Sequence, residues 1–215
     1  MLKKSTLLVT ALLPPLFLAV MSFHYLPKLL HEVLGILWGL AALLHIWQHR
    51  SFFATLGRGR WTRQRLLITL VDFLLLALLL VTVLAGLGIS NHLLKDFLPL
   101  DWRRSITLHQ LHVSLPYALL ILSGLHLGQH WQGFAAQLRR LLPPIVLPGL
   151  PAGVKWGLGL LVVALGLYGS FLNRIGDRLL LKHIFATPAT GEPAAVYLLL
   201  LCGVGGMYLL IGRKL

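Results

Sequence analysis

The sequence predicts an all-α fold, a polytopic membrane bundle of about six transmembrane helices, and three observations support it. Of the 215 residues, 57% are hydrophobic. Only 12% are Asp, Glu, Lys or Arg, about half the charged share of an ordinary soluble domain. The apolar residues also gather in runs long enough to cross a hydrocarbon core of about 30 Å. Each run is expected to be helical because lipid cannot satisfy exposed backbone groups.

Six apolar runs make up most of the chain. They cover about residues 6 to 23, 30 to 48, 66 to 89, 106 to 130, 155 to 173 and 194 to 212. The first run also resembles a secretory signal, but no small-x-small cleavage site precedes His24. We therefore expect it to remain as a helix, kinked at Pro14 and Pro15.

The chain is expected to have three parts. Residues 1–131 form a four-helix core, residues 132–154 a proline-rich connector, and residues 155–215 a C-terminal pair of transmembrane helices. The connector contains LPPIVLPGLPAG, whose prolines favour a stiff extended chain. The last two spans contain no histidine, so we expect them to serve packing or docking.

The Lys and Arg residues indicate the orientation in the membrane. With the N-terminus in the cytoplasm, twelve of them fall on the cytoplasmic side and seven on the other. This excess predicts a multi-pass protein with both termini cytoplasmic. The formal net charge of +13 is dispersed over loops, without a basic helix or stacking aromatics, so we expect membrane lipid and not nucleic acid as a partner.

Two apolar runs carry the same histidine pattern. HEVLGILWGLAALLHIWQHR (31–50) and HVSLPYALLILSGLHLGQHW (112–131) both place histidine at the first, fifteenth and nineteenth positions. In a helix, residues that are 14 positions apart project about 40° from each other and lie about 21 Å apart along the axis. A single span separates the two runs, so they are expected to be parallel. The spacing then predicts that His31 faces His112 at one depth and His45 faces His126 at another.

Facing imidazoles at a fixed depth are typical axial ligands of haem iron. The pattern therefore predicts a dihaem four-helix core with four iron ligands: His31, His112, His45 and His126. Both haem b groups are expected to be non-covalent, because Cys202 is the single cysteine and no Cys-x-x-Cys-His motif is present. A non-haem metal would gather about four donors at one depth, and we expect no Cys, Asp or Glu beside these pairs.

Glycines near the ligands have two interpretations. They let a flat macrocycle approach the backbone, or they allow tight helix packing. The glycines concerned are Gly35, Gly39, Gly124 and Gly128.

His49 and His130 lie one turn beyond the inner ligands. Three roles are open: bonding haem propionates, lining a quinone pocket, or replacing His45 and His126 as ligands through the 18-residue spacing. A plain interfacial position is an equal alternative.

Four further residues are candidates for a propionate or quinone site. His109, Arg103 and Arg104 are placed to grip the propionates of the outer haem, although headgroup anchoring explains the arginines equally well. Asp72 is an acid inside the third span, where such groups tend to be functional. It suggests a proton relay to quinone or a structural ion pair, with His49, His130 or Arg65 as its partner.

These residues resemble known families. The His-x13-His spacing on two parallel helices looks like the dihaem core of the respiratory cytochrome b superfamily, over roughly residues 5–131. The longer His-x13-His-x3-His form and the opening His31-Glu32-x-Leu34-Gly35 resemble the flavinylation-associated membrane cytochrome family. Tyr168-Gly169 and Phe171 in the C-terminal helix pair add to this second resemblance.

The resemblance implies b-type haem and electron exchange between the quinone pool and an extracytoplasmic redox protein, often one with covalent flavin. Bis-histidine iron has no open position, so it should pass single electrons. We therefore expect an electron-transfer subunit of an oxidoreductase complex in the cytoplasmic (inner) membrane of a bacterium, with quinone or quinol as substrate. Two alternatives are a stand-alone transmembrane reductase for ferric iron or another exogenous acceptor, and a His-lined metal or proton transporter.

Overall fold

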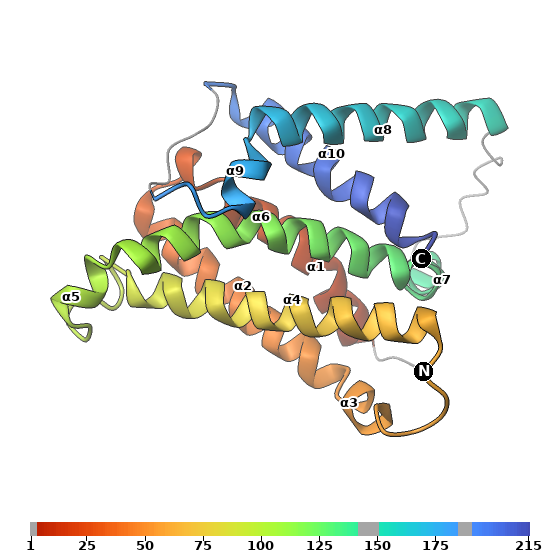
Figure 1. The fold of residues 1–215 in the computed structure, drawn as a ribbon, viewed down its shortest axis with the longest axis horizontal. Coiled ribbons are helices and arrows are strands. Elements are labelled where there is room, and N and C mark those ends of the chain that lie inside the picture. Colours follow the sequence, from red (N-terminus) through yellow and green to blue (C-terminus); the bar gives the residue numbers. More distant parts are fainter. Residues whose placement is uncertain (1–3, 142–150, 185–190) are drawn as a thin grey trace.

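The structure is a computed structural model that describes residues 4–141, 151–184 and 191–215. Within these ranges every regular element is a helix (Figure 1), as the composition predicts. The long helices are α1 (Lys4–Met21), α2 (Lys28–Gln48), α4 (Arg63–Gly88), α6 (Ile106–Gln129), α8 (Ala152–Leu172) and α10 (Ala194–Gly212). The shorter helices are η1 (Phe23–Tyr25), α3 (Ser51–Thr55), α5 (Leu100–Arg103), α7 (Trp131–Leu141) and α9 (Ile175–Leu179).

The helices are suited to a membrane. In the described part of the chain, five are long and apolar enough to cross one, namely α2 (continued by α3), α4, α6, α8 and α10. The first predicted span is the shorter apolar helix Ser5–Met21 within α1, which continues through Pro14 and Pro15. Large apolar side chains cover the outer faces, as Leu84 and Phe171 illustrate with 64% and 79% exposure. The predicted helical membrane bundle is confirmed. The N-terminal end of α1 and the C-terminal end of α10 lie at the same end of the bundle (Figure 1).

Capping and proline residues set several helix boundaries. The Thr62 and Ser105 side chains accept hydrogen bonds from the backbone N–H groups of Arg65 and Leu108, at 3.2 and 3.3 Å, where α4 and α6 begin. Proline directly precedes four other helices, α2, α5, α8 and α10. Local sequence therefore sets where these helices begin.

The core consists of two helix pairs that face each other. α1 packs on α2, and α4 packs on α6, whereas α2 and α6 are not among the closely packed helix pairs. Phe17 and Trp38 stack between α1 and α2 with ring centres 4.7 Å apart. α2 and α6 run in the same direction (Figure 1), so their histidines can meet across the space between the pairs.

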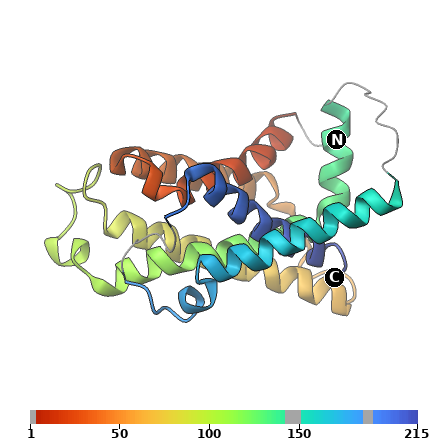
Figure 2. The same cartoon turned by 90° about the horizontal axis from the view of Figure 1, so that it is seen from above.

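The C-terminal helices pack against this core. α10 lies between α6 and α8, and α8 is on the outside, while α7 runs crosswise to the long helices (Figure 2). Tyr197 of α10 donates a hydrogen bond to the Met21 carbonyl at 3.2 Å, and its hydroxyl lies 3.3 Å from that of Tyr117 on α6. Of the predicted connector, residues 132–141 belong to α7, and residues 142–150 lie outside the described part of the chain.

Candidate functional site

The four predicted ligand histidines form two facing pairs. The ring centres of His31 and His112 are 6.0 Å apart with their planes at 79°. Those of His45 and His126 are 6.3 Å apart at 82°. Both pairs join α2 to α6, and the second lies toward the end where the chain starts and finishes. The structure therefore brings together each pair that the spacing predicts.

The ring separation suits a metal held from two sides. Metal–nitrogen bonds of about 2 Å, with roughly 1.2 Å from each nitrogen to its ring centre, separate two trans imidazoles by about 6.4 Å. The two observed separations, 6.0 and 6.3 Å, are close to this value. The ring separation in each pair is therefore compatible with two histidines holding one metal ion.

Each of these histidines is oriented through Nδ1. Nδ1 of His31 donates to the Val20 carbonyl and Nδ1 of His112 to the Thr82 carbonyl, both at 3.0 Å. The Nδ1 partners in the other pair are side chains: Thr10 Oγ1 for His45 at 3.2 Å, and Asp72 Oδ1 for His126 at 2.7 Å. A proton on Nδ1 leaves the Nε2 lone pair for a metal, which is the usual arrangement of a histidine ligand.

A cavity of about 550 Å³ surrounds the His31–His112 pair. This volume falls within the range of about 300–1,000 Å³ that is typical of cofactor sites. Its walls come from α1, α2, α4 and α6, with further residues from η1, α9 and α10, and they include Phe17, Gly35, Trp38, Gly86 and Pro116. A large, mostly apolar group could therefore lie between these two helix pairs.

Two glycines border this cavity in different ways. A Cβ atom at Gly35 would meet nothing within 4 Å, so open space lies over this glycine. A Cβ at Gly86 would lie 2.5 Å from Cε1 of His112, so Gly86 leaves the room that the ring occupies. Gly124 and Gly128 instead allow α10 to approach α6, which supports the helix-packing interpretation for them.

Arg178 lines the cavity, although the sequence pattern predicts no functional role for it. It lies on α9, is 2% exposed, and its guanidinium stands 4.5 Å from the centre of the Tyr117 ring. Its Nε donates to the Asn173 carbonyl at 3.0 Å, which fixes the side chain. Since α9 follows the connector by more than twenty residues, no spacing rule links it to the histidines.

His24 is a second cavity residue without a predicted role. It lies in η1, between α1 and α2. Burial lowers the pKa of His24 below its usual 6.5, and the positive charge of Arg178 lowers it further. The ring is therefore neutral at neutral pH.

The three residues predicted to bind the propionates of the outer haem do not all lie at the cavity. His109 lines the cavity, and its Nδ1 donates to the Ser105 carbonyl at 2.9 Å. Arg103 and Arg104 lie in and after the short helix α5 and are not among the cavity-lining residues. Of the predicted group, only His109 borders the cavity, where Arg178 supplies a guanidinium.

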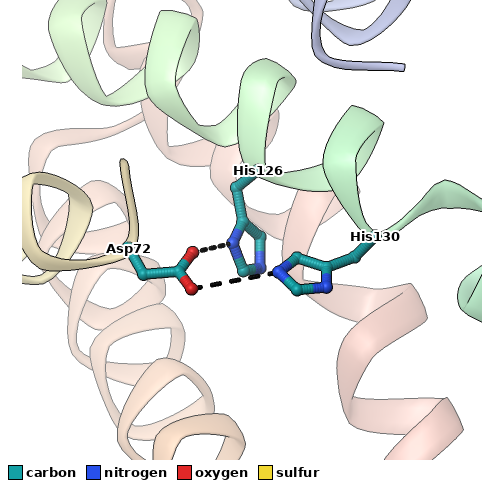
Figure 3. A group of neighbouring side chains, drawn as sticks. All are labelled: Asp72, His126 and His130. Atoms are coloured by element: carbon teal, nitrogen blue, oxygen red, sulfur yellow. Dashed lines mark hydrogen bonds and ion pairs between the residues drawn. The ribbon is translucent and has the colours of Figure 1, made fainter. Parts of the chain in front are cut away.

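At the other pair, an acid joins the histidines. Figure 3 shows the Asp72 carboxylate of α4 facing His126 and His130, with His130 Nε2 at 3.9 Å from Oδ2. One ligand atom from each of these three residues lies within 4.8 Å of the others, a spacing that could hold a metal ion. The expectation that no acid lies beside the pairs was wrong, because α4 packs on α6 and brings together residues that are 54 positions apart.

The predicted partners of Asp72 are corrected in part. His130 is a partner, and His126 is a closer one that was not predicted. Arg65 instead donates to the carbonyls of Thr55 and Leu56 at 2.8 and 3.0 Å. The acid thus belongs to the histidine cluster and not to the α3–α4 loop.

His49 and His130 directly follow α2 and α6 as their C-cap residues. The His49 ring centre lies 4.6 Å from that of His45, and the His130 ring centre lies 4.8 Å from that of His126. Each therefore contacts the ligand candidate of its own helix.

Comparisons of this chain with protein-family models, with curated proteins and with solved structures found no match. The functional conclusion therefore rests on the residues and their geometry.

Proposed function

We propose that the protein is a dihaem b-type cytochrome subunit that carries electrons across the membrane between the quinone pool and a redox protein outside it. The observation that carries the proposal is the two histidine pairs, with ring centres 6.0 and 6.3 Å apart, at the two depths that the repeated spacing defines. Bound haem would supply reversible one-electron oxidation and reduction. The resemblance to flavinylation-associated cytochromes agrees with this role.

The residues of the chain have distinct tasks in this proposal. His31 and His112 would hold one haem iron through Nε2, and His45 and His126 would hold the other. The Val20 and Thr82 carbonyls, the Thr10 hydroxyl and the Asp72 carboxylate keep the rings in place through Nδ1. With two histidines holding each iron, the haems would supply one-electron transfer, and neither substrate nor oxygen would bind to the iron.

Arg178 and His109 would receive the carboxylates of the first haem. Both border the cavity, and a buried guanidinium suits bidentate binding of a carboxylate. Arg103 and Arg104 are then left to interact with headgroups, the second role foreseen for them. The C-terminal helices would thus complete the haem site through α9 as well as packing on α6.

Pyridine haemochrome analysis of the purified protein tests the proposal. About two haem b per chain is expected, with low-spin spectra and reduction by a quinol. Double replacement of His31 and His112 by alanine should leave one haem, and the corresponding change at His45 and His126 should leave the other. A chain purified from haem-replete membranes without haem would refute the proposal.

A second candidate function, a histidine-lined metal site, is favoured by one observation. Asp72, His126 and His130 could hold a transition metal ion directly (Figure 3). The two uses of His126 exclude each other, because a directly bound metal would take either Nε2, which the haem iron would need, or Nδ1, which donates to Asp72. Elemental analysis decides between them: stoichiometric zinc or copper that is lost in Asp72→Ala, without a Soret band, would favour metal binding or transport.

A further inference from the structure

The Nδ1 partners differ in charge between the two histidine pairs. In the His31–His112 pair, both rings donate to neutral backbone carbonyls, of Val20 and Thr82. In the His45–His126 pair, one ring donates to the Thr10 hydroxyl and the other to the Asp72 carboxylate. Thr10 acts as an acceptor because its own proton goes to the Thr6 carbonyl at 2.9 Å. Asp72 is therefore the one ionisable partner among the four.

Asp72 holds its charge close to the ring. The contact to His126 is 2.7 Å, shorter than the other three, and the carboxylate is 14% exposed. Arg65, the basic residue nearest in the sequence on α4, is bound to the carbonyls of Thr55 and Leu56. His130 Nε2 lies 3.9 Å from the other carboxylate oxygen. Among the described residues, no Lys or Arg side chain forms an ion pair with this carboxylate.

The cavity around the other pair is lined by two cations and one acid. Arg178 and Lys28 line the cavity around His31 and His112. One acid, Glu32, also lines it, but its carboxylate accepts hydrogen bonds from Ser90 Oγ and from the backbone N–H of Asn91 and Leu93. His31 and His112 themselves are bonded to carbonyls and not to this acid.

A carboxylate bonded to an axial imidazole makes the ligand more basic and favours the more positively charged, oxidised iron. Cations near a site favour the reduced iron. We infer that Asp72 makes the haem of the His45–His126 pair the lower in reduction potential, so that electrons are stabilised on the haem of the His31–His112 pair. This inference rests on the proposed function. Electrons would then move downhill from the haem of the His45–His126 pair, at the end that holds both chain termini, to the haem of the His31–His112 pair.

Potentiometric titration of the haem-loaded protein tests the order of the two potentials. Single-pair variants, with His31 and His112 or His45 and His126 replaced by alanine, assign the two one-electron waves. The wave assigned to His45–His126 is expected at the lower potential. This measurement does not depend on any change at Asp72, and the reverse order would overturn the inference.

The Asp72→Asn variant tests the cause. It keeps the shape of the side chain and removes the charge. The equilibrium constant for reduction of the His45–His126 haem should therefore rise at least tenfold, which raises its reduction potential by about 59 mV for one electron. Thr10→Val removes a neutral acceptor from His45 and should shift the same wave by a smaller factor. Equal shifts of both waves, or none, would overturn the role of Asp72. If Asp72→Asn does not retain haem, Asp72→Glu replaces it and is expected to keep the wild-type order. A wild-type chain without haem refutes the proposed function instead.

Discussion

The guanidinium of Arg178 lies 4.5 Å from the centre of the Tyr117 ring, which joins the short helix α9 to the middle of α6. Both residues border the cavity around His31 and His112, so a part of the chain without membrane-embedded histidines contributes to the candidate cofactor site. The C-terminal helices are consequently more than an external docking element.

Arg178→Gln should weaken the binding of haem at the His31–His112 pair. A hydrogen bond to a charged group contributes about 1.5–3 kcal/mol, so we expect affinity to fall roughly tenfold or more. Haem titration into the apoprotein measures this. Arg174→Gln is the matched control, because Arg174 lies just before the same helix but is exposed and paired with Asp177 at 2.7 Å. Equal affinities in the two variants would show that Arg178 does not contact the cofactor.

Gly86→Ala should displace the His112 ring. The added Cβ would lie 2.5 Å from Cε1 and 2.7 Å from Nδ1 of this histidine. The ring would then have to leave the position in which Nδ1 donates to the Thr82 carbonyl. We expect one low-spin haem to be lost and the haem of the other pair to remain, as measured by haem content and low-temperature spectra. Gly157→Ala on α8 is the control, since its Cβ would meet nothing within 4 Å. Retention of both haems in Gly86→Ala would contradict the assignment of His112.

The Glu32 carboxylate anchors the segment that follows α4. It accepts hydrogen bonds from Ser90 Oγ at 2.8 Å and from the backbone N–H groups of Asn91 and Leu93 at 3.0 and 2.9 Å. Glu32→Ala leaves these donors without their partner and should lower the free energy of unfolding by about 1–3 kcal/mol. Thermal unfolding in detergent measures the loss. An unchanged melting temperature would show that water replaces the carboxylate at no cost.

The histidine pairs could be predicted from the sequence because they depend only on helical periodicity and on the parallel direction of two spans. The contact between Asp72 and His126 could not, since it depends on how α4 rotates against α6. Arg178 could not be predicted for a related reason, because α9 reaches the cavity through its tertiary packing on α6. Arg103 and Arg104 are near His109 in the sequence, but neither lines the cavity. Local spacing therefore located the ligands, and long-range packing determined their surroundings.

The third histidine of each repeat provides the last prediction. His45 and His126 face each other across the helix pairs, whereas His49 and His130 each contact the histidine ring of their own helix at a tilted angle. His45→Ala or His126→Ala should therefore remove one low-spin haem, and His49→Ala or His130→Ala should leave both in place. Electron paramagnetic resonance of the four variants counts the low-spin centres directly. Loss of a centre in His49→Ala together with its retention in His45→Ala would mean that the 18-residue spacing provides the ligands. The facing geometry of His45 and His126 would then serve packing alone.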